Sequence, residues 1–137
     1  MFKAVLVMIL AVMSSNAMAE WVAVGISEDN TIYIDPSTIR KAGDRVKMWH
    51  LYDLKSAKPF PGLEKYLSLK GQAEYDCKQE QVRELYSSAH SENMGWGNII
   101  FRNTDAGEWA PLPPGSGGKI MWKAACERNL KRTLAFK

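Results

Sequence analysis

Cysteine and histidine are both scarce in this chain of 137 residues, which contains two of each. His50 and His90 have no second histidine or cysteine within four positions, although zinc ligands usually come in such closely spaced pairs. No CxxC, CxxCH or GxSxG motif occurs either. The sequence therefore carries no signature of a metal centre, of covalently attached haem or of a serine hydrolase, and we expect neither a catalytic residue nor a metal ligand.

Neither the charge nor the hydropathy points to nucleic acid or to a membrane span. Lys and Arg number 18 against 15 Asp and Glu, which gives a formal net charge of +3. These charges are spread along the chain, whereas nucleic-acid-binding domains gather basic residues on one face. The one long apolar run, Ala4–Met13, covers about half of the ~20 residues that a transmembrane helix needs. We expect no nucleic-acid partner and no transmembrane segment in the mature protein.

The first 19 residues have the three parts of a secretory signal peptide. Lys3 precedes the apolar run, and the tripeptide AMA at 17–19 supplies an A-x-A cleavage site. We predict cleavage after residue 19, which leaves 20–137 as one small domain in the periplasm or on the outer cell surface. No cysteine stands at the cleavage site to carry a lipid anchor.

Export changes the interpretation of the two cysteines, because thiols in an oxidising compartment normally close into disulfides. Two cysteines permit one intramolecular bond, and we predict that Cys77 and Cys126 form it. The alternative is a nucleophilic cysteine served by His50 or His90, but no flanking motif supports it.

The hydrophobic pattern of the mature chain is mostly that of β-strands. The runs EWVAVGIS and NTIYIDP, at 20–27 and 30–36, read as a hairpin around Asp29-Asn30. We expect the next stretch, 36–43, to form one brief helical turn that Gly43 ends. Residues 45–54 carry apolar side chains on both faces, which is typical of a central strand.

Period-two alternation is cleanest at residues 65–77. Its odd positions hold apolar side chains and its even positions polar ones, and the odd set is Leu67, Leu69, Ala73, Tyr75 and Cys77. The pattern predicts a strand that turns Cys77 toward the core and its polar neighbours toward water. The element that carries Cys126 must then pack on the same face.

The segment that carries Cys126, residues 116–130, has the spacing of a helix. Ser116 is placed as its N-cap, and Trp122, Ala125 and Cys126 fall on one stripe. We therefore expect an α+β fold in which an antiparallel sheet has a C-terminal helix packed on one face and joined to it by one disulfide.

One segment fits two structures. In QVRELYSSAH, at 81–90, Val82, Leu85 and Tyr86 lie at helical spacing. Its Ser-rich end and the turn-prone SENMGWGN that follows also fit a hairpin strand.

The residues most suited to binding a partner lie at the end of that segment and just after it. Trp96 stands between two glycines, where an exposed indole could serve as a binding residue, or where the glycines could let the ring tuck under the sheet. We take Arg83, His90, Met94 and Trp96 as the candidate binding site, because the loop combines Gly mobility with an aromatic ring and polar groups. The rival function is periplasmic binding of haem or another small ligand through His50, His90 or Met94.

The ordered set of motifs resembles the surface-adhesin protein E family of exported Gram-negative proteins. The resemblance covers nearly the whole mature chain and rests on YIDPSTIRKAGDRVKMWHLYDLK, EYDC with a following Arg such as Arg83, YSSAHSENMGWG, EWAPLPPGSGG and a late AAC. It implies a six-stranded antiparallel sheet with a C-terminal helix joined to it by the cysteine pair. It also implies that 81–90 is a strand.

For function, the resemblance implies a non-enzymatic binding module of the cell envelope. The family's namesake is an outer-membrane lipoprotein adhesin that binds host matrix proteins such as vitronectin and laminin, and also plasminogen and haem. This chain differs in having no lipidation cysteine. The expected partner is a host extracellular-matrix protein or another envelope protein, and the expected state is a monomer or weak dimer, since an exposed sheet edge can pair two chains.

Overall fold

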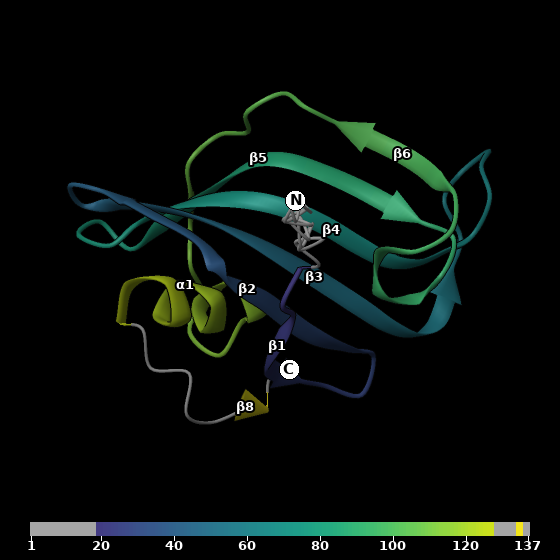
Figure 1. Cartoon of the computed structure of the whole chain (residues 1–137), viewed down its shortest axis with the longest axis horizontal. Helices are drawn as coiled ribbons and strands as arrows, with labels where there is room; N and C mark the ends of the chain where they lie inside the picture. The colour runs from purple at the N-terminus through teal and green to yellow at the C-terminus, as the bar shows by residue number, and fades with distance from the viewer. Residues whose placement is uncertain (1–18, 128–133, 136–137) are drawn as a thin grey trace, which may run out of the picture.

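A computed structural model describes residues 19–127 and the backbone of 134–135. The predicted signal peptide, apart from Ala19, lies outside the described residues. No helix in the described part of the chain is long and apolar enough to cross a membrane. One curved sheet forms most of the described structure, and the α-helix of its C-terminal part packs at one end of the sheet (Figure 1).

The sheet follows the order of the chain, with one hairpin after another. In this order the elements are β1 (Val22–Ile26), β2 (Asn30–Ala42), β3 (Arg45–Lys58), β4 (Tyr66–Asp76), β5 (Gln81–His90), the 3-10 turn η1 (Asn93–Gly95), β6 (Ile99–Asn103), β7 (Ala110–Pro111), α1 (Gly117–Glu127) and β8 (Leu134–Ala135). The strand order across the sheet is β6-β5-β4-β3-β2-β1-β8, and β7 pairs with β5. Among the described strands, β1 to β7 form antiparallel pairs and β8 alone is parallel to its neighbour, so the predicted fold class is confirmed.

The predicted helical turn at 36–43 is wrong, because β2 continues through this stretch with a bulge. The register against β3 shifts between Asp35 and Arg40. The Asp35 carboxylate accepts hydrogen bonds from the backbone N–H of Ser37 at 3.0 Å and from its hydroxyl at 2.6 Å. An Asp-Pro-Ser sequence can make these local bonds in a helix cap or in a bulge, so sequence alone does not distinguish the two.

Residues 81–90 form strand β5, as the resemblance implied and against the helical spacing of the apolar residues. A second bulge explains that spacing. Glu84 pairs with Ala73 and Tyr86 pairs with Gln72, which leaves Leu85 as the extra residue on β5. An inserted residue breaks strict alternation, and apolar side chains on either side of it fall at helix-like intervals.

The core lies between α1 and the strands β1 to β4. Its buried apolar side chains are Val24, Ile32, Ile34, Val46, Met48, Ala73, Tyr75, Ile120, Met121, Trp122, Ala124 and Ala125. Ser116 caps the helix as predicted, because its hydroxyl accepts a hydrogen bond from the Lys119 N–H at 3.2 Å. Burial of these side chains is the main favourable term for attaching the helix to the sheet.

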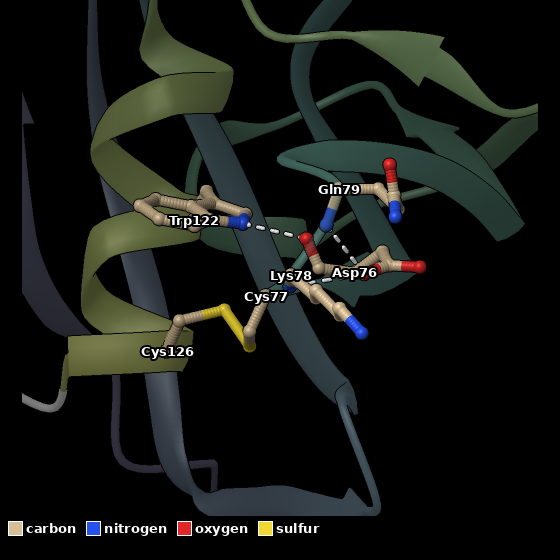
Figure 2. The surroundings of a disulfide bond; sticks show 6 residues. All are labelled: Asp76, Cys77, Lys78, Gln79, Trp122 and Cys126. Atoms are coloured by element: carbon tan, nitrogen blue, oxygen red, sulfur yellow. Dashed lines mark hydrogen bonds between the residues drawn. A yellow bond between two sulfur atoms is a disulfide. The ribbon is translucent and has the colours of Figure 1, made fainter.

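The predicted disulfide joins Cys77, just after β4, to Cys126 in the last turn of α1. The two Cα atoms lie 5.7 Å apart, within the range that a disulfide spans. Figure 2 shows a second link beside it, in which the Trp122 indole N–H donates to the backbone carbonyl of Asp76 at 3.0 Å. A covalent bond and a hydrogen bond therefore hold one face of α1 against the end of β4.

The alternation along β4 predicts burial of the apolar positions correctly only near the helix, and there Glu74 on the opposite face is buried as well. Ala73 and Tyr75 are buried, but Leu67 and Leu69 are only half-buried because α1 does not extend over their end of the strand. On the opposite face Ser68 is fully buried, although we expected it to point to water. The loop that follows β5 covers it, as described below.

Breaking the disulfide should strongly destabilise the protein. The bond closes a loop of 49 residues, and the chain-entropy model assigns such a loop about 4 kcal/mol. We expect the Cys77→Ser, Cys126→Ser double variant to lose a large part of that amount in free energy of unfolding, measured by urea denaturation. A double variant that unfolds at the same urea concentration as the oxidised wild type would show that the helix needs no covalent link.

Candidate functional site

No α-helix of residues 19–127 packs on the face of the sheet opposite α1, and we call this face the helix-free face. Alternation places Trp49 of β3, Lys70 of β4 and Tyr86 of β5 on it. The Trp49 and Tyr86 rings lie 5.3 Å apart, and the Lys70 ammonium lies 5.3 Å above the Trp49 ring. The middle of this face is therefore a half-buried aromatic surface with a positive charge on it.

The loop after β5, residues 91–98, folds back onto one end of the helix-free face. The Met94 N–H donates to the Asp53 carboxylate at 2.8 Å, and the Gly95 N–H donates to the Ser68 hydroxyl at 2.9 Å. That hydroxyl in turn donates to the carbonyl of Glu92 at 2.7 Å. These bonds tie the loop to both β3 and β4, which is why Ser68 is buried.

The glycines that flank Trp96 set the shape of this loop. Gly95 and Gly97 both have positive φ, at 76° and 81°. A Cβ on Gly97 would collide with the Ser91 hydroxyl and lie 2.8 Å from Cγ of Glu92. The glycines therefore permit a tight turn that other residues would strain, and we infer a fixed loop where the sequence suggested a mobile one.

Trp96 is exposed, with 63% of its surface accessible, so the ring does not tuck under the sheet. It borders a hollow of about 380 Å³ together with Trp21, Lys70 and Met94. The Lys70 ammonium lies 6.0 Å above the Trp21 ring. The structure thus brings Met94 and Trp96 together, as proposed from sequence, and adds Trp21 and Lys70 to them.

Arg83 lies far from this hollow. It lies near the opposite end of β5, seven residues before His90. At about 3.3 Å per residue, this separation is about 23 Å along the strand. Its guanidinium contacts the Glu74 carboxylate at 2.7 Å and lies 4.9 Å above the Trp109 ring. Arg83 therefore supports a separate cluster and does not contribute to the surface around Trp96.

His90 is buried beneath the loop. Its Nε2 lies 2.7 Å from the Ser88 hydroxyl. Burial lowers the pKa of His90, and the positive charges of Lys70 and Arg102 lower it further. This histidine is a neutral structural group and is not exposed to a partner.

Neither histidine has a ring nitrogen that is both unbonded and open to solvent. Nε2 of His50 is taken by Glu84 at 2.8 Å, and Nε2 of His90 by Ser88. Nδ1 of each ring is buried away from solvent. Each ring therefore has one nitrogen engaged and the other covered. Among the described residues, no three His, Cys, Asp or Glu side chains gather closely enough to hold a metal ion.

Sequence reasoning missed Trp21 and Lys70. Both belong to the surface around Trp96, but they come from the start of the domain and from the middle of β4. Alternation could have placed Lys70 on the same face as Trp49. No local signal shows that the loop after β5 returns to that face.

The buried state of His90 predicts a pH dependence of stability. Because its pKa is lowered in the folded state, the unfolded chain binds a proton more strongly below about pH 6.5. Stability is therefore complete above that pH and falls as the pH is lowered, by at most about 1.4 kcal/mol per pH unit for one group. We expect urea denaturation between pH 7 and 5 to show a smaller loss in His90→Gln than in the wild type. Parallel losses in the two proteins would contradict this account.

Solved structures of protein E from Haemophilus influenzae have the same fold. One is 14% identical, with a TM-score of 0.60 over 85% of this chain and 91% of that chain. The protein from a non-typeable strain is 12% identical, with a TM-score of 0.58 over 88% and 84%. A selenomethionine form is 15% identical, with a TM-score of 0.55 over 73% and 81%. At these identities the likeness concerns the fold alone.

Comparison of the sequence with models of known families identifies the family of this chain. None of the curated proteins gives a significant sequence match to this chain. The model of the surface-adhesin protein E family, however, matches residues 21–127, which is most of the chain and nearly all of its described part. The chain belongs to the surface-adhesin protein E family.

Proposed function

We propose that this chain is an exported, non-enzymatic binding module that acts as an adhesin on the cell surface and contacts its partner through Trp96. The observation that carries the proposal is an indole with 63% of its surface exposed, on a loop that hydrogen bonds hold to the sheet. Membership of a surface-adhesin family supports it. The partner that we propose is a host extracellular-matrix protein.

An exposed tryptophan on a fixed loop suits a protein interface. Tryptophan is among the residues that contribute most to binding energy at interfaces, because its large ring buries much apolar surface and its N–H can still donate. Holding the loop before binding reduces the entropy lost on association. Three backbone features already hold it, namely the N–H bonds of Met94 and Gly95 and the closure between the Ser91 N–H and the Asn98 carbonyl at 2.9 Å.

Charge on this surface favours an acidic segment of the partner. Lys70 lies against the rings of Trp21 and Trp49, so its ammonium stands beside the hollow that Trp96 borders. A partner carboxylate could reach that ammonium while its apolar neighbours cover Trp96. The charge would mainly steer the encounter, and the indole would supply most of the affinity.

The proposal of a non-enzymatic role rests on the family and on the way the histidines are used. His90 is buried against Ser88, and His50 is paired with Glu84. In a hydrolytic triad the histidine needs a nucleophile on one nitrogen and an acid on the other. Neither ring has both of these partners within the described residues.

Replacing Trp96 by alanine should weaken binding to the matrix partner. Hot-spot residues cost 2 kcal/mol or more when truncated, which corresponds to a loss of about 30-fold in affinity. The measurement is surface plasmon resonance of the mature protein over immobilised laminin and vitronectin. Ile26→Ala is the matched control, because Ile26 is also a large exposed apolar residue, at 46%, but belongs to β1 and does not line the hollow that Trp96 borders.

Equal binding of wild type and Trp96→Ala to a matrix protein would contradict the proposed contact residue. Failure of the wild type to bind any matrix protein, together with capture of another envelope protein through Trp96, would keep the surface and replace the partner.

A further inference from the structure

A second hollow lies on the other face of the sheet, beyond the end of α1. Its volume is about 360 Å³, within the usual range of small-ligand sites. Tyr52, Tyr66, Phe60 and Phe101 line it together with the pair formed by His50 and Glu84. We call this hollow the His50 groove.

The pair in the groove reaches across a whole strand. His50 belongs to β3 and Glu84 to β5, yet Nε2 and Oε1 lie 2.8 Å apart, over Gly71 of β4. A Cβ on Gly71 would collide with the Glu84 carboxylate and lie 2.9 Å from Cε1 of His50. Glycine is therefore required between the two side chains. The bulge at Leu85 lies next to Glu84, in the position where bulges commonly redirect a side chain.

One oxygen of Glu84 remains available to a ligand. Oε1 is bonded to His50, and Oε2 has no hydrogen bond or ion pair with any described residue. The side chain is 40% exposed. A carboxylate held in place by one oxygen and open at the other can accept a donor from a bound molecule.

Among the described residues that line the groove, Glu84 is the only acidic one. Lys70 also lines it, but its ammonium lies on the helix-free face, against Trp49 and Trp21. Burial, followed by the charge of Glu84, raises the pKa of Tyr52 to about 12, so its hydroxyl stays neutral. Among the described lining residues, none other than Lys70 carries a fixed positive charge, and its ammonium lies on the opposite face. Oε2 of Glu84 is therefore left to a ligand, while Oε1 is bonded to His50.

The walls of the groove are aromatic and partly open to solvent. Phe60 and Phe101 stack with their centroids 5.2 Å apart, and Phe60 meets Tyr66 edge-on at 6.1 Å. Phe101 keeps 42% of its surface exposed although its ring faces this cluster. Aromatic faces attract cations, and ammonium ions bind where such rings stand near a carboxylate.

We propose that the His50 groove binds a small organic cation, namely an ammonium ion with an aromatic or alkyl body. The ammonium donates to Oε2 of Glu84, and the apolar body packs against Phe60, Tyr66 and Phe101. This site lies on the opposite face from Trp96, so it is independent of the proposed adhesive contact.

The test compares three probes of one shape and different charge, each titrated into the oxidised mature protein by ¹H–¹⁵N NMR. The probes are 2-phenylethylammonium, 2-phenylethanol and 3-phenylpropionate. We expect the ammonium ion to bind about tenfold more tightly than the alcohol, the size of effect for a charge-assisted hydrogen bond at a partly exposed site. The propionate should bind no more tightly than the alcohol. Shifted signals should include those of Gly71, Glu84 and Ala89, and exclude that of Trp96.

Glu84→Gln keeps the shape of the side chain and removes its charge, so it should bind the ammonium ion and the alcohol equally. Glu28→Gln is the control, because Glu28 is exposed in the turn between β1 and β2. It should keep the tenfold preference. Phe101→Ala should weaken all three probes.

Three results would overturn the proposal: equal binding of ammonium ion and alcohol by the wild type, an unchanged preference in Glu84→Gln, or no shift at the groove with any probe. Because the wild-type comparison needs no variant, misfolding of Glu84→Gln does not remove the test. Loss of matrix binding in Trp96→Ala is read separately and is unaffected by these outcomes.

Discussion

The whole arrangement depends on one short helix that must cover a long sheet. α1 has 11 residues, a length of about 16 Å, whereas β3 has 14 residues and extends about 46 Å. Even aligned with the strands, the helix could cover only about a third of β3. The disulfide from Cys126 to Cys77 and the bond from Trp122 to Asp76 hold it at one end (Figure 2). In the described part of the chain, no α-helix covers the sheet beyond that end or on the opposite face, so loops cover part of these surfaces and the rest faces solvent.

The two faces of the sheet differ in what covers the area that α1 does not reach. On the helix-free face the loop at 91–98 covers Ser68 and His90 and presents Trp96 to solvent. On the helix side the uncovered end of the sheet remains a groove, with a buried histidine and a carboxylate at its base and aromatic rings around it. Lys70 borders both hollows. Its ammonium lies on the helix-free face over the Trp49 ring, although the residue is also part of the lining of the groove on the other face. The two proposed sites are therefore neighbours through the sheet but open in opposite directions.

Sequence predicted the features that depend on local pattern. Alternation located the strands, Ser116 marked the helix start, and export with two cysteines led to the disulfide. It failed at the bulge near Asp35, because the local hydrogen bonds there match those of a helix cap. At the bulge near Leu85 the apolar spacing alone fitted both a helix and a strand, and the family resemblance correctly favoured the strand. At the candidate site, it found Trp96 and Met94 but not the residues that meet them. Those contacts join segments far apart in sequence, and only the course of the chain after β5 decides which face the loop covers.

The central claim is that the helix-free face is displayed to the outside of the cell. The most direct measurement is labelling of intact cells with an antibody against the folded domain, with permeabilised cells and a periplasmic marker as controls. The account predicts that intact cells bind the antibody while the marker stays hidden. Labelling only after permeabilisation would contradict surface display and, with it, the adhesive function of Trp96.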